Sequence, residues 1–129
     1  MPKFVRSGLE HWSLGRATLL GDAAHAMEPF QAQGAAQAVE DAYVLAACVS
    51  AHDDVVDAFG AYERIRTARA EELQESSAAA ANVFYLPDGE DQRKRDARYA
   101  TLPEELPFGT RQPIWEYDVR DALARAGVD

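Results

Sequence analysis

Residues 15–29 read GRATLLGDAAHAMEP and residues 33–42 read QGAAQAVEDA, and these two stretches decide the fold. The first begins with a short apolar run between Gly15 and Gly21, which is typical of a buried strand that ends in a turn. We therefore predict a strand over residues 16–21. A lone strand leaves backbone groups unpaired on both edges. We expect it to be covered by a sheet from outside this chain or by a second copy, unless the segment refolds.

The second stretch opens a predicted helix over residues 34–50. Small and apolar side chains recur there at three- and four-residue spacing, and Glu40 and Asp41 are expected to point away from them. The predicted apolar face consists of Ala35, Ala38, Val39, Ala42, Tyr43, Leu45, Ala46 and Val49. So many alanines favour close packing against a neighbouring element.

A longer helix of close to thirty residues is predicted after the cap-type residues Asp53 and Asp54. The sequence Leu86-Pro87-Asp88-Gly89 ends it, because proline cannot continue the hydrogen-bond ladder. Its aromatic residues are expected in the helix core rather than in a substrate cage. They are Phe59, Tyr62, Phe84 and Tyr85.

Two shorter helices are predicted in the remainder of the chain. Residues 90–99 are nearly all charged, so they indicate an exposed helix. Asp118 is a cap-type residue for a last helix that ends at Gly127. That helix is expected to turn Val119, Leu123 and Ala126 inward.

Length and charge narrow the classes of function. A chain of 129 residues with 47% hydrophobic residues corresponds to one domain, which excludes a two-domain enzyme. Its 22 acidic and 13 basic residues give a net charge of -9, which disfavours nucleic acid and anionic membranes as partners. The single cysteine, Cys48, cannot form an internal disulfide, and no export signal or membrane span is visible, so a cytoplasmic location is expected.

Taken together, the two stretches resemble the FAD-binding segment of flavoprotein aromatic hydroxylases, the single-component monooxygenases of the salicylate hydroxylase and hydroxybenzoate hydroxylase type. Trp12, the sequence Tyr62-Glu63-x-x-Arg66 with Arg69, and Trp115-x-Tyr117-Asp118 fit the same family. The resemblance therefore covers most of the chain.

The resemblance implies a fold that is mainly α with a short residual β element, the C-terminal portion of an FAD/NAD(P)-binding α/β hydroxylase. Residues 1–129 would form a single domain, with an FAD-contacting strand, loop and helix at 16–50 and a helical C-terminal part at 54–129. The eight glycines never occur two apart, so the chain has no Gly-x-Gly-x-x-Gly turn for a pyrophosphate. A separate N-terminal FAD-binding part, or self-association, would have to complete the site.

The resemblance also assigns the residues that bind the cofactor. Asp22 would hold the ribitol or ribose side of FAD, and Gly21 lets the backbone approach. The unsatisfied amides and positive dipole end of the helix after Gln33 would seat the negative edge of reduced flavin. The full set is Gly21, Asp22, Pro29, Ala32, Gln33, Gly34, Ala35 and Ala36. No catalytic side chain and no metal ligand is predicted.

Two positions depart from the commonest family pattern. Ala32 stands where a glycine is expected and Ala36 where an asparagine is expected. Ala32 would matter only if the backbone there needed a positive φ. Ala36 would remove one polar contact near the flavin.

Several of the residues singled out also have purely structural interpretations. Asp22 alone could cap a turn or helix. His25 is expected to pack or to form hydrogen bonds in its loop, while His11 and His52 are expected at the surface. Cys48 is expected to be a small buried apolar residue.

The leading functional hypothesis is therefore part of an FAD-dependent monooxygenase that hydroxylates a phenolic or aromatic acid. In the family, NADH or NADPH reduces the flavin, and one oxygen atom of O2 is transferred to the ring. This chain is expected to be inactive without its N-terminal part. The alternative is a non-catalytic helical interaction or scaffold module derived from such an enzyme. The ring substrate, the choice of reductant, the oligomeric state and whether the chain is a natural short product remain open.

Overall fold

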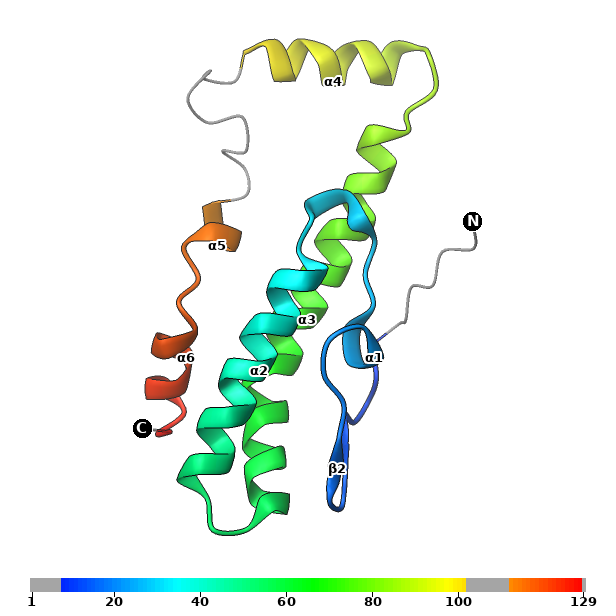
Figure 1. The fold of residues 1–129 in the computed structure, drawn as a ribbon. Coiled ribbons are helices and arrows are strands. Elements are labelled where there is room, and N and C mark those ends of the chain that lie inside the picture. The colour runs from blue at the N-terminus through cyan, green and yellow to red at the C-terminus, as the bar shows by residue number, and fades with distance from the viewer. Residues whose placement is uncertain (1–7, 102–111, 129) are drawn as a thin grey trace.

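A long antiparallel helix pair forms the body of the molecule in a computed structural model that describes residues 8–101 and 112–128. Helix α2 (Gly34–Ala51) and helix α3 (Val55–Phe84) lie side by side over the whole length of α2 (Figure 1). The Asp54 carboxylate accepts a hydrogen bond from the Val56 N–H at 2.7 Å and caps α3. Both predicted helices and this cap are therefore confirmed.

The predicted strand over residues 16–21 is wrong in its extent. Strand β2 is only Ala17–Thr18, and it pairs antiparallel with β1 (Ser13–Leu14) across a turn in which Gly15 has φ 55°. Beyond β2 the Leu19 N–H donates to the Trp12 carbonyl at 3.0 Å, and the Leu19 carbonyl accepts from the Tyr62 hydroxyl at 3.1 Å. The segment thus finds its partners in preceding residues and in α3 of the same chain.

Two short elements connect the hairpin to the helix pair. Helix α1 (Asp22–His25) and the 3-10 helix η1 (Pro29–Gln31) run beside α3 before the chain enters α2 (Figure 1). The Gln74 amide donates to the Ala26 carbonyl at 3.0 Å, and the Ser77 hydroxyl donates to the Glu28 carbonyl. These contacts from α3 fix the path of the connecting loop.

The apolar core lies between the hairpin, α2 and α3. The Trp12 ring packs against the rings of Tyr62, at 5.9 Å, and His25, at 5.4 Å between centroids. Val44 and Cys48 are completely buried on α2. The expectations for Tyr62 and Cys48 as core residues are thus confirmed.

Helix α2 does not bury the face that its apolar pattern predicts. Val39, Tyr43 and Val49 are 70%, 51% and 46% exposed. Its buried residues are instead Gln37, Asp41, Val44 and Cys48. The expectation that Asp41 points away from the core is therefore wrong, because α3 offers this carboxylate a charged partner.

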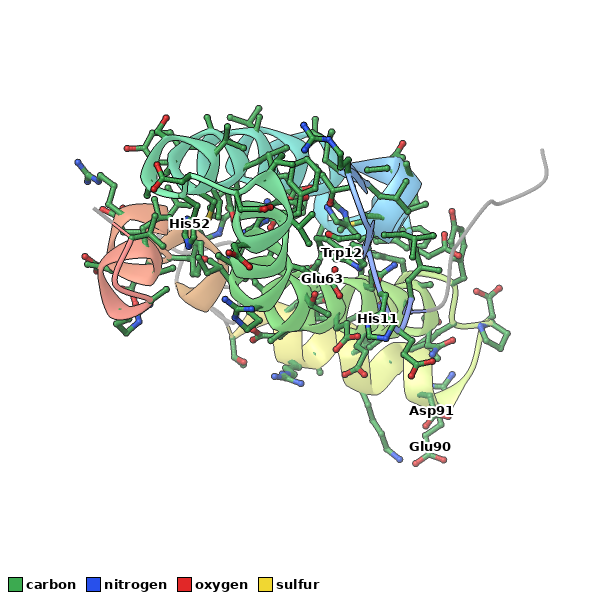
Figure 2. The ribbon with its side chains drawn as sticks, turned by 90° about the horizontal axis from the view of Figure 1, so that it is seen from below. His11, Trp12, His52, Glu63, Glu90 and Asp91 are labelled. Atoms are coloured by element: carbon green, nitrogen blue, oxygen red, sulfur yellow. The ribbon has the colours of Figure 1, made fainter. Side chains whose placement is uncertain are left out.

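The far end of α3 is less covered than predicted. Phe84 and Tyr85 are 45% and 71% exposed, so they are not core residues, although the Phe30 ring lies 5.9 Å and 5.4 Å from theirs. Helix α4 (Glu90–Ala100) then runs across beyond the free end of α3 and has no buried residue, as its charge predicts (Figure 1). Its Glu90 and Asp91 side chains point away from the body (Figure 2).

The C-terminal segment returns to α2. It contains α5 (Gln112–Trp115), which the sequence did not predict, and α6 (Val119–Arg125), capped by Asp118 as predicted. Leu123 is buried, but Ala126 is exposed, because the helix ends before it. No helix in the described ranges is long and apolar enough to cross a membrane.

Candidate functional site

A glycine turn brings two of the predicted FAD-binding residues, Gly21 and Asp22, to α2. Gly21 has φ 59°, and a Cβ built on it would lie 3.3 Å from the Ala38 Cβ, so both the backbone angle and the close approach require glycine. The Gly21 N–H donates to the Asp41 carboxylate at 2.8 Å. The turn is therefore tied directly to α2.

Asp22 follows this turn as the first residue of α1. Its side chain is exposed, and no side-chain hydrogen bond caps α1, so the structural interpretation of Asp22 as a cap is wrong. A Cβ built on Gly34 would lie 3.8 Å from the Asp22 Oδ1. The fold thus brings the Asp22 carboxylate beside the first residue of α2.

The N-terminus of α2 has no side-chain cap. Gln33 occupies the N-cap position in a right-handed helical conformation, and its side chain makes no capping hydrogen bond. The first backbone bond after it runs from the Gln37 N–H to the Gln33 carbonyl at 2.8 Å. The amides of Gly34, Ala35 and Ala36 precede that bond, so they form the positive end of an 18-residue helix.

Ala32 has a positive φ, the backbone angle at which the replacement of the family's glycine by alanine matters. Its φ is 53° and its ψ is 33°, and its N–H donates to the Pro29 carbonyl at 3.0 Å to close η1. This left-handed conformation costs a residue with a Cβ about 1–2 kcal/mol. Ala32 is therefore a strained position within the predicted site.

A buried carboxylate, Asp41, holds these elements together. Its Oδ2 accepts hydrogen bonds from the Gly21 N–H and from the His25 Nε2 at 2.6 Å. Its Oδ1 accepts from the Arg66 Nε at 2.8 Å. His25 is 1% exposed and contacts Trp12, so the expectation that it packs or forms hydrogen bonds is confirmed, although its hydrogen-bond partner lies on α2 and not in its own loop.

Arg66 extends the network along α2. It is completely buried, pairs with Glu40 at 2.7 Å, and donates to the Gln37 Oε1 at 2.7 Å. The Gln37 amide in turn donates to the Gln33 Oε1 at 3.4 Å. One chain of contacts thus runs from the Gly21 turn to Gln33, the N-cap residue of α2.

The network favours the charged forms of Asp41 and Arg66. Burial alone would raise the pKa of Asp41, but hydrogen bonds from His25, Gly21 and Arg66 outweigh burial and hold the pKa below its ordinary value. Burial opposes the charge of Arg66 as well, and its bonds to Asp41 and Glu40 raise its pKa. A carboxylate can only accept, so the His25 Nε2 is the donor in its hydrogen bond with the Asp41 carboxylate. The His25 Nδ1 is buried and has no hydrogen-bond partner among the described residues.

Comparison with known proteins assigns the family. A family model described as an FAD binding domain matches residues 5–77. The chain belongs to this FAD-binding family.

Relatives of this chain are aromatic monooxygenases by name. It is 46% identical over 99 residues to a 3-amino-4-hydroxybenzoate 2-monooxygenase of Streptomyces platensis, covering 76% of this chain and 25% of the relative. It is 44% identical over 84 residues to 3-hydroxybenzoate 6-hydroxylase 1 of Aquipseudomonas alcaligenes, covering 65% and 21%. The chain thus spans about a quarter of the length of these relatives.

A solved structure supports the same relationship. The fold matches a structure described as a salicylate hydroxylase substrate complex with a TM-score of 0.70 and 32% identity, over 94% of this chain and 29% of that one. The mainly helical fold with a small β element, implied by the sequence resemblance, is therefore shown.

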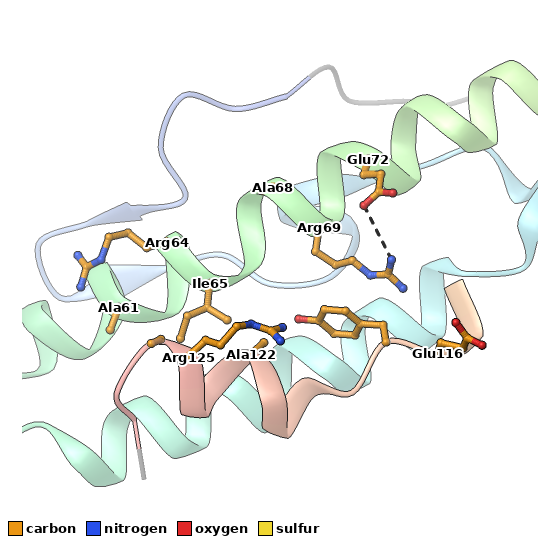
Figure 3. Close-up of a pocket in the computed structure, with 11 residues that line it drawn as sticks. Ala61, Arg64, Ile65, Ala68, Arg69, Glu72, Glu116, Ala122 and Arg125 are labelled. Atoms are coloured by element: carbon orange, nitrogen blue, oxygen red, sulfur yellow. Dashed lines mark ion pairs between the residues drawn. The ribbon is translucent and has the colours of Figure 1, made fainter. Parts of the chain in front are cut away.

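A groove between α3 and the C-terminal segment contains none of the predicted FAD-binding residues. Its volume is about 710 Å³, and it lies between α3 and the segment around α6 (Figure 3). Within it the Arg69 guanidinium lies 4.4 Å from the centre of the Tyr117 ring and donates to the Ile114 carbonyl at 3.1 Å. Two stretches that carry the family resemblance therefore meet where the C-terminal segment docks.

The hairpin is anchored by a separate cluster on α3. The Glu63 carboxylate accepts from the Ser13 N–H at 2.9 Å and lies 3.3 Å from the His11 ring (Figure 2). Burial would raise the pKa of Glu63, but its bonds with Ser13 and His11 lower it. His11 is exposed as expected, whereas His52 is half-buried and contacts the Cys48 carbonyl at 2.9 Å, which corrects the surface position expected for it.

Sequence reasoning missed the residues that organise the candidate site. Gln37, Asp41 and Arg66 are completely buried, yet they were not among the predicted site residues. All three belong to stretches that resemble the family, and this resemblance was one available signal. Gln37 and Asp41 are polar residues four positions apart on α2, and this spacing was an indication that they share one face of the helix.

Proposed function

We propose that this chain supplies one side of the flavin site of an FAD-dependent, NAD(P)H-using monooxygenase that hydroxylates a phenolic or aromatic acid. The observation that carries the proposal is the position of the Asp22 carboxylate beside the uncapped start of α2. In this proposal residues 16–50 contact FAD, and residues 54–129 support them. The polypeptide that binds the pyrophosphate lies outside this chain.

The chemistry of the two neighbouring groups fits a flavin nucleotide. An exposed carboxylate accepts hydrogen bonds from hydroxyl groups such as those of ribitol or ribose. The free amides and positive dipole end of α2 favour a negatively charged edge. Acceptor and donors thus lie at one place, as a ligand with both hydroxyls and a negative edge requires.

Each proposed residue has one role in holding the cofactor. Asp22 binds the diol, and the backbone amides of Gly34, Ala35 and Ala36 face the flavin edge, whereas the Ala32 N–H is already bonded to the Pro29 carbonyl. Bound flavin would supply the redox chemistry with O2. Pro29 fixes the backbone of the loop beside the ring and limits the access of water from that side.

The outer face of α2 supports the need for further polypeptide. Val39 and Tyr43 are exposed one turn apart, and Leu14 on the hairpin is 87% exposed. Apolar surface of this kind marks a face that another part of a protein covers. We assign that cover to the remainder of the monooxygenase.

A chimera tests the proposal. This chain would replace the matching segment of the Streptomyces platensis relative, which supplies the remaining polypeptide. We expect the purified chimera to retain FAD after desalting, as measured by its visible absorbance. We also expect it to oxidise NADH or NADPH faster when the aromatic acid named for that relative is present.

Two variants of the chimera identify the site. Asp22→Ala should lose FAD, whereas Asp53→Ala, which removes an exposed carboxylate outside the proposed site, should retain it. A folded chimera that binds no FAD would falsify the proposed function. It would favour the alternative of a non-catalytic interaction module.

A further inference from the structure

We propose that Asp41 is the positioning residue of the flavin site, which sets the Gly21–Asp22 turn against the first turn of α2. The inference rests on the proposed function, because it concerns the alignment of two groups that would hold one cofactor. Asp41 itself is completely buried and does not face the site. It therefore acts through Gly21 and not by touching the ligand.

Three donors converge on this one carboxylate. The Gly21 N–H and the His25 Nε2 share its Oδ2, and the Arg66 Nε occupies its Oδ1. The hydrogen bond from the Gly21 N–H connects Asp41 to the site, since Asp22 is the next residue after Gly21. A side chain without an acceptor at this place leaves the Gly21 N–H buried and unpaired, which favours movement of the turn.

The same network reaches the other half of the site. Arg66 joins Asp41 to Gln37, and Gln37 contacts Gln33 at the N-cap of α2. The carboxylate of Asp22 and the amides after Gln33 are thus both connected to one buried hub, which consists of Asp41, Arg66 and Gln37. Because the hub is made of side chains packed between two helices, it holds the two groups at a fixed separation before any ligand binds.

The test separates positioning from stability. The double variant Asp41→Leu with Arg66→Met replaces the buried ion pair by apolar groups, an exchange that is often neutral for stability. It also removes the acceptor of Gly21. The matched control is Val44→Ala, which makes a cavity on the same face of α2 and leaves every hydrogen bond of Asp41 in place.

Amide hydrogen exchange in the 129-residue chain is the first measurement, and it needs no flavin. We expect the Gly21 amide of the double variant to exchange at least about tenfold faster than in the wild type, relative to amides in the middle of α3. In Val44→Ala the Gly21 and α3 amides should change together. If the double variant does not fold, Asp41→Ser with Arg66→Met replaces it, because the serine hydroxyl is one bond too short to reach Gly21 and no buried charge is left unpaired.

FAD affinity in the chimera is the second measurement. We expect the double variant to weaken FAD binding about tenfold or more, and Val44→Ala to stay near the wild type. Equal losses in both variants, or an unchanged Gly21 exchange rate, would overturn the inference. A wild-type chimera that binds no FAD counts against the proposed function, and the exchange measurement then decides the positioning role alone.

Discussion

On its inner face helix α2 carries Gln37 and Asp41, both completely buried, whereas on its outer face Val39 and Tyr43 are 70% and 51% exposed. The inner face is stabilised by specific partners, since Arg66 from α3 contacts both of its polar residues. The outer face has apolar side chains without a cover in the described part of the chain. A helix of this kind is oriented by its polar contacts and completed by a neighbour on its apolar side.

Removing the ion pair between Arg66 and Asp41 on the inner face of α2 should have the largest effect on stability. Arg66→Met leaves the buried Asp41 without its charged partner, and we expect the free energy of unfolding to fall by about 3–5 kcal/mol. Urea unfolding followed by circular dichroism measures this loss. Arg64→Met, an exposed change on the same helix, should alter stability by less than about 0.5 kcal/mol. Similar losses in both variants would show that the network carries no special stability.

Low pH should weaken the contacts of Asp41 on the inner face of α2 within a defined range of pH. The pKa of Asp41 in the folded chain is lower than the ordinary value of about 3.9, so its contribution is complete above that pH and is lost as the pH falls through the folded value. The stability difference between the wild type and Asp41→Asn should therefore shrink below about pH 4. Urea unfolding of both proteins from pH 3 to pH 7 measures it, with ~0.1 M salt throughout. A difference that stays constant over this range would contradict an ionised Asp41.

A smaller effect is expected where the chain enters α2. Ala32→Gly relieves the left-handed backbone at φ 53°, so we expect a gain of about 0.5–1 kcal/mol. The same exchange at Ala36, inside the first turn of α2, should instead lose about 0.5–1 kcal/mol. Thermal unfolding of the two variants should show opposite changes of the midpoint. Equal signs would mean that Ala32 is not strained.

The outer face should contribute least to the stability of this chain. Val39→Lys places a charge on an exposed position, and we expect stability to change by less than about 0.5 kcal/mol. The same change should reduce any association between copies, which sedimentation velocity measures. In the chimera it should lower the yield of folded protein, because the charge would then meet the covering polypeptide. A large loss of stability in the isolated chain would show that this face is already packed.

The parts of the fold that depend on local chemistry were predictable. Asp54 and Asp118 cap the helices that the sequence assigned to them, because a cap needs only a side chain and a nearby N–H. The extent of the strand was not predictable. Its pairing depends on Gly15 adopting a positive φ, which closes a hairpin of two residues on each side.

The candidate site residues were predicted from the family resemblance and not from periodicity, and their role in binding FAD stays a prediction. Asp22 and Gly34 both belonged to the predicted set, and they lie side by side in the structure. The apolar pattern of α2 pointed to the wrong face, since it cannot distinguish a core within this chain from a surface that meets other polypeptide. The burial of Asp41 depends on Arg66, which lies 25 positions further along the chain.

These short separations along the chain bear on how the molecule folds. Arg66 finds its contacts 25 to 29 positions away, in the helix that directly precedes its own. Closing so small a loop costs little chain entropy, and local contacts favour rapid folding. We therefore expect the α2–α3 hairpin to fold as an early cooperative unit. The buried contacts of Asp41 with Arg66 would then exist before the surrounding polypeptide is in place, ready to hold the Gly21–Asp22 turn.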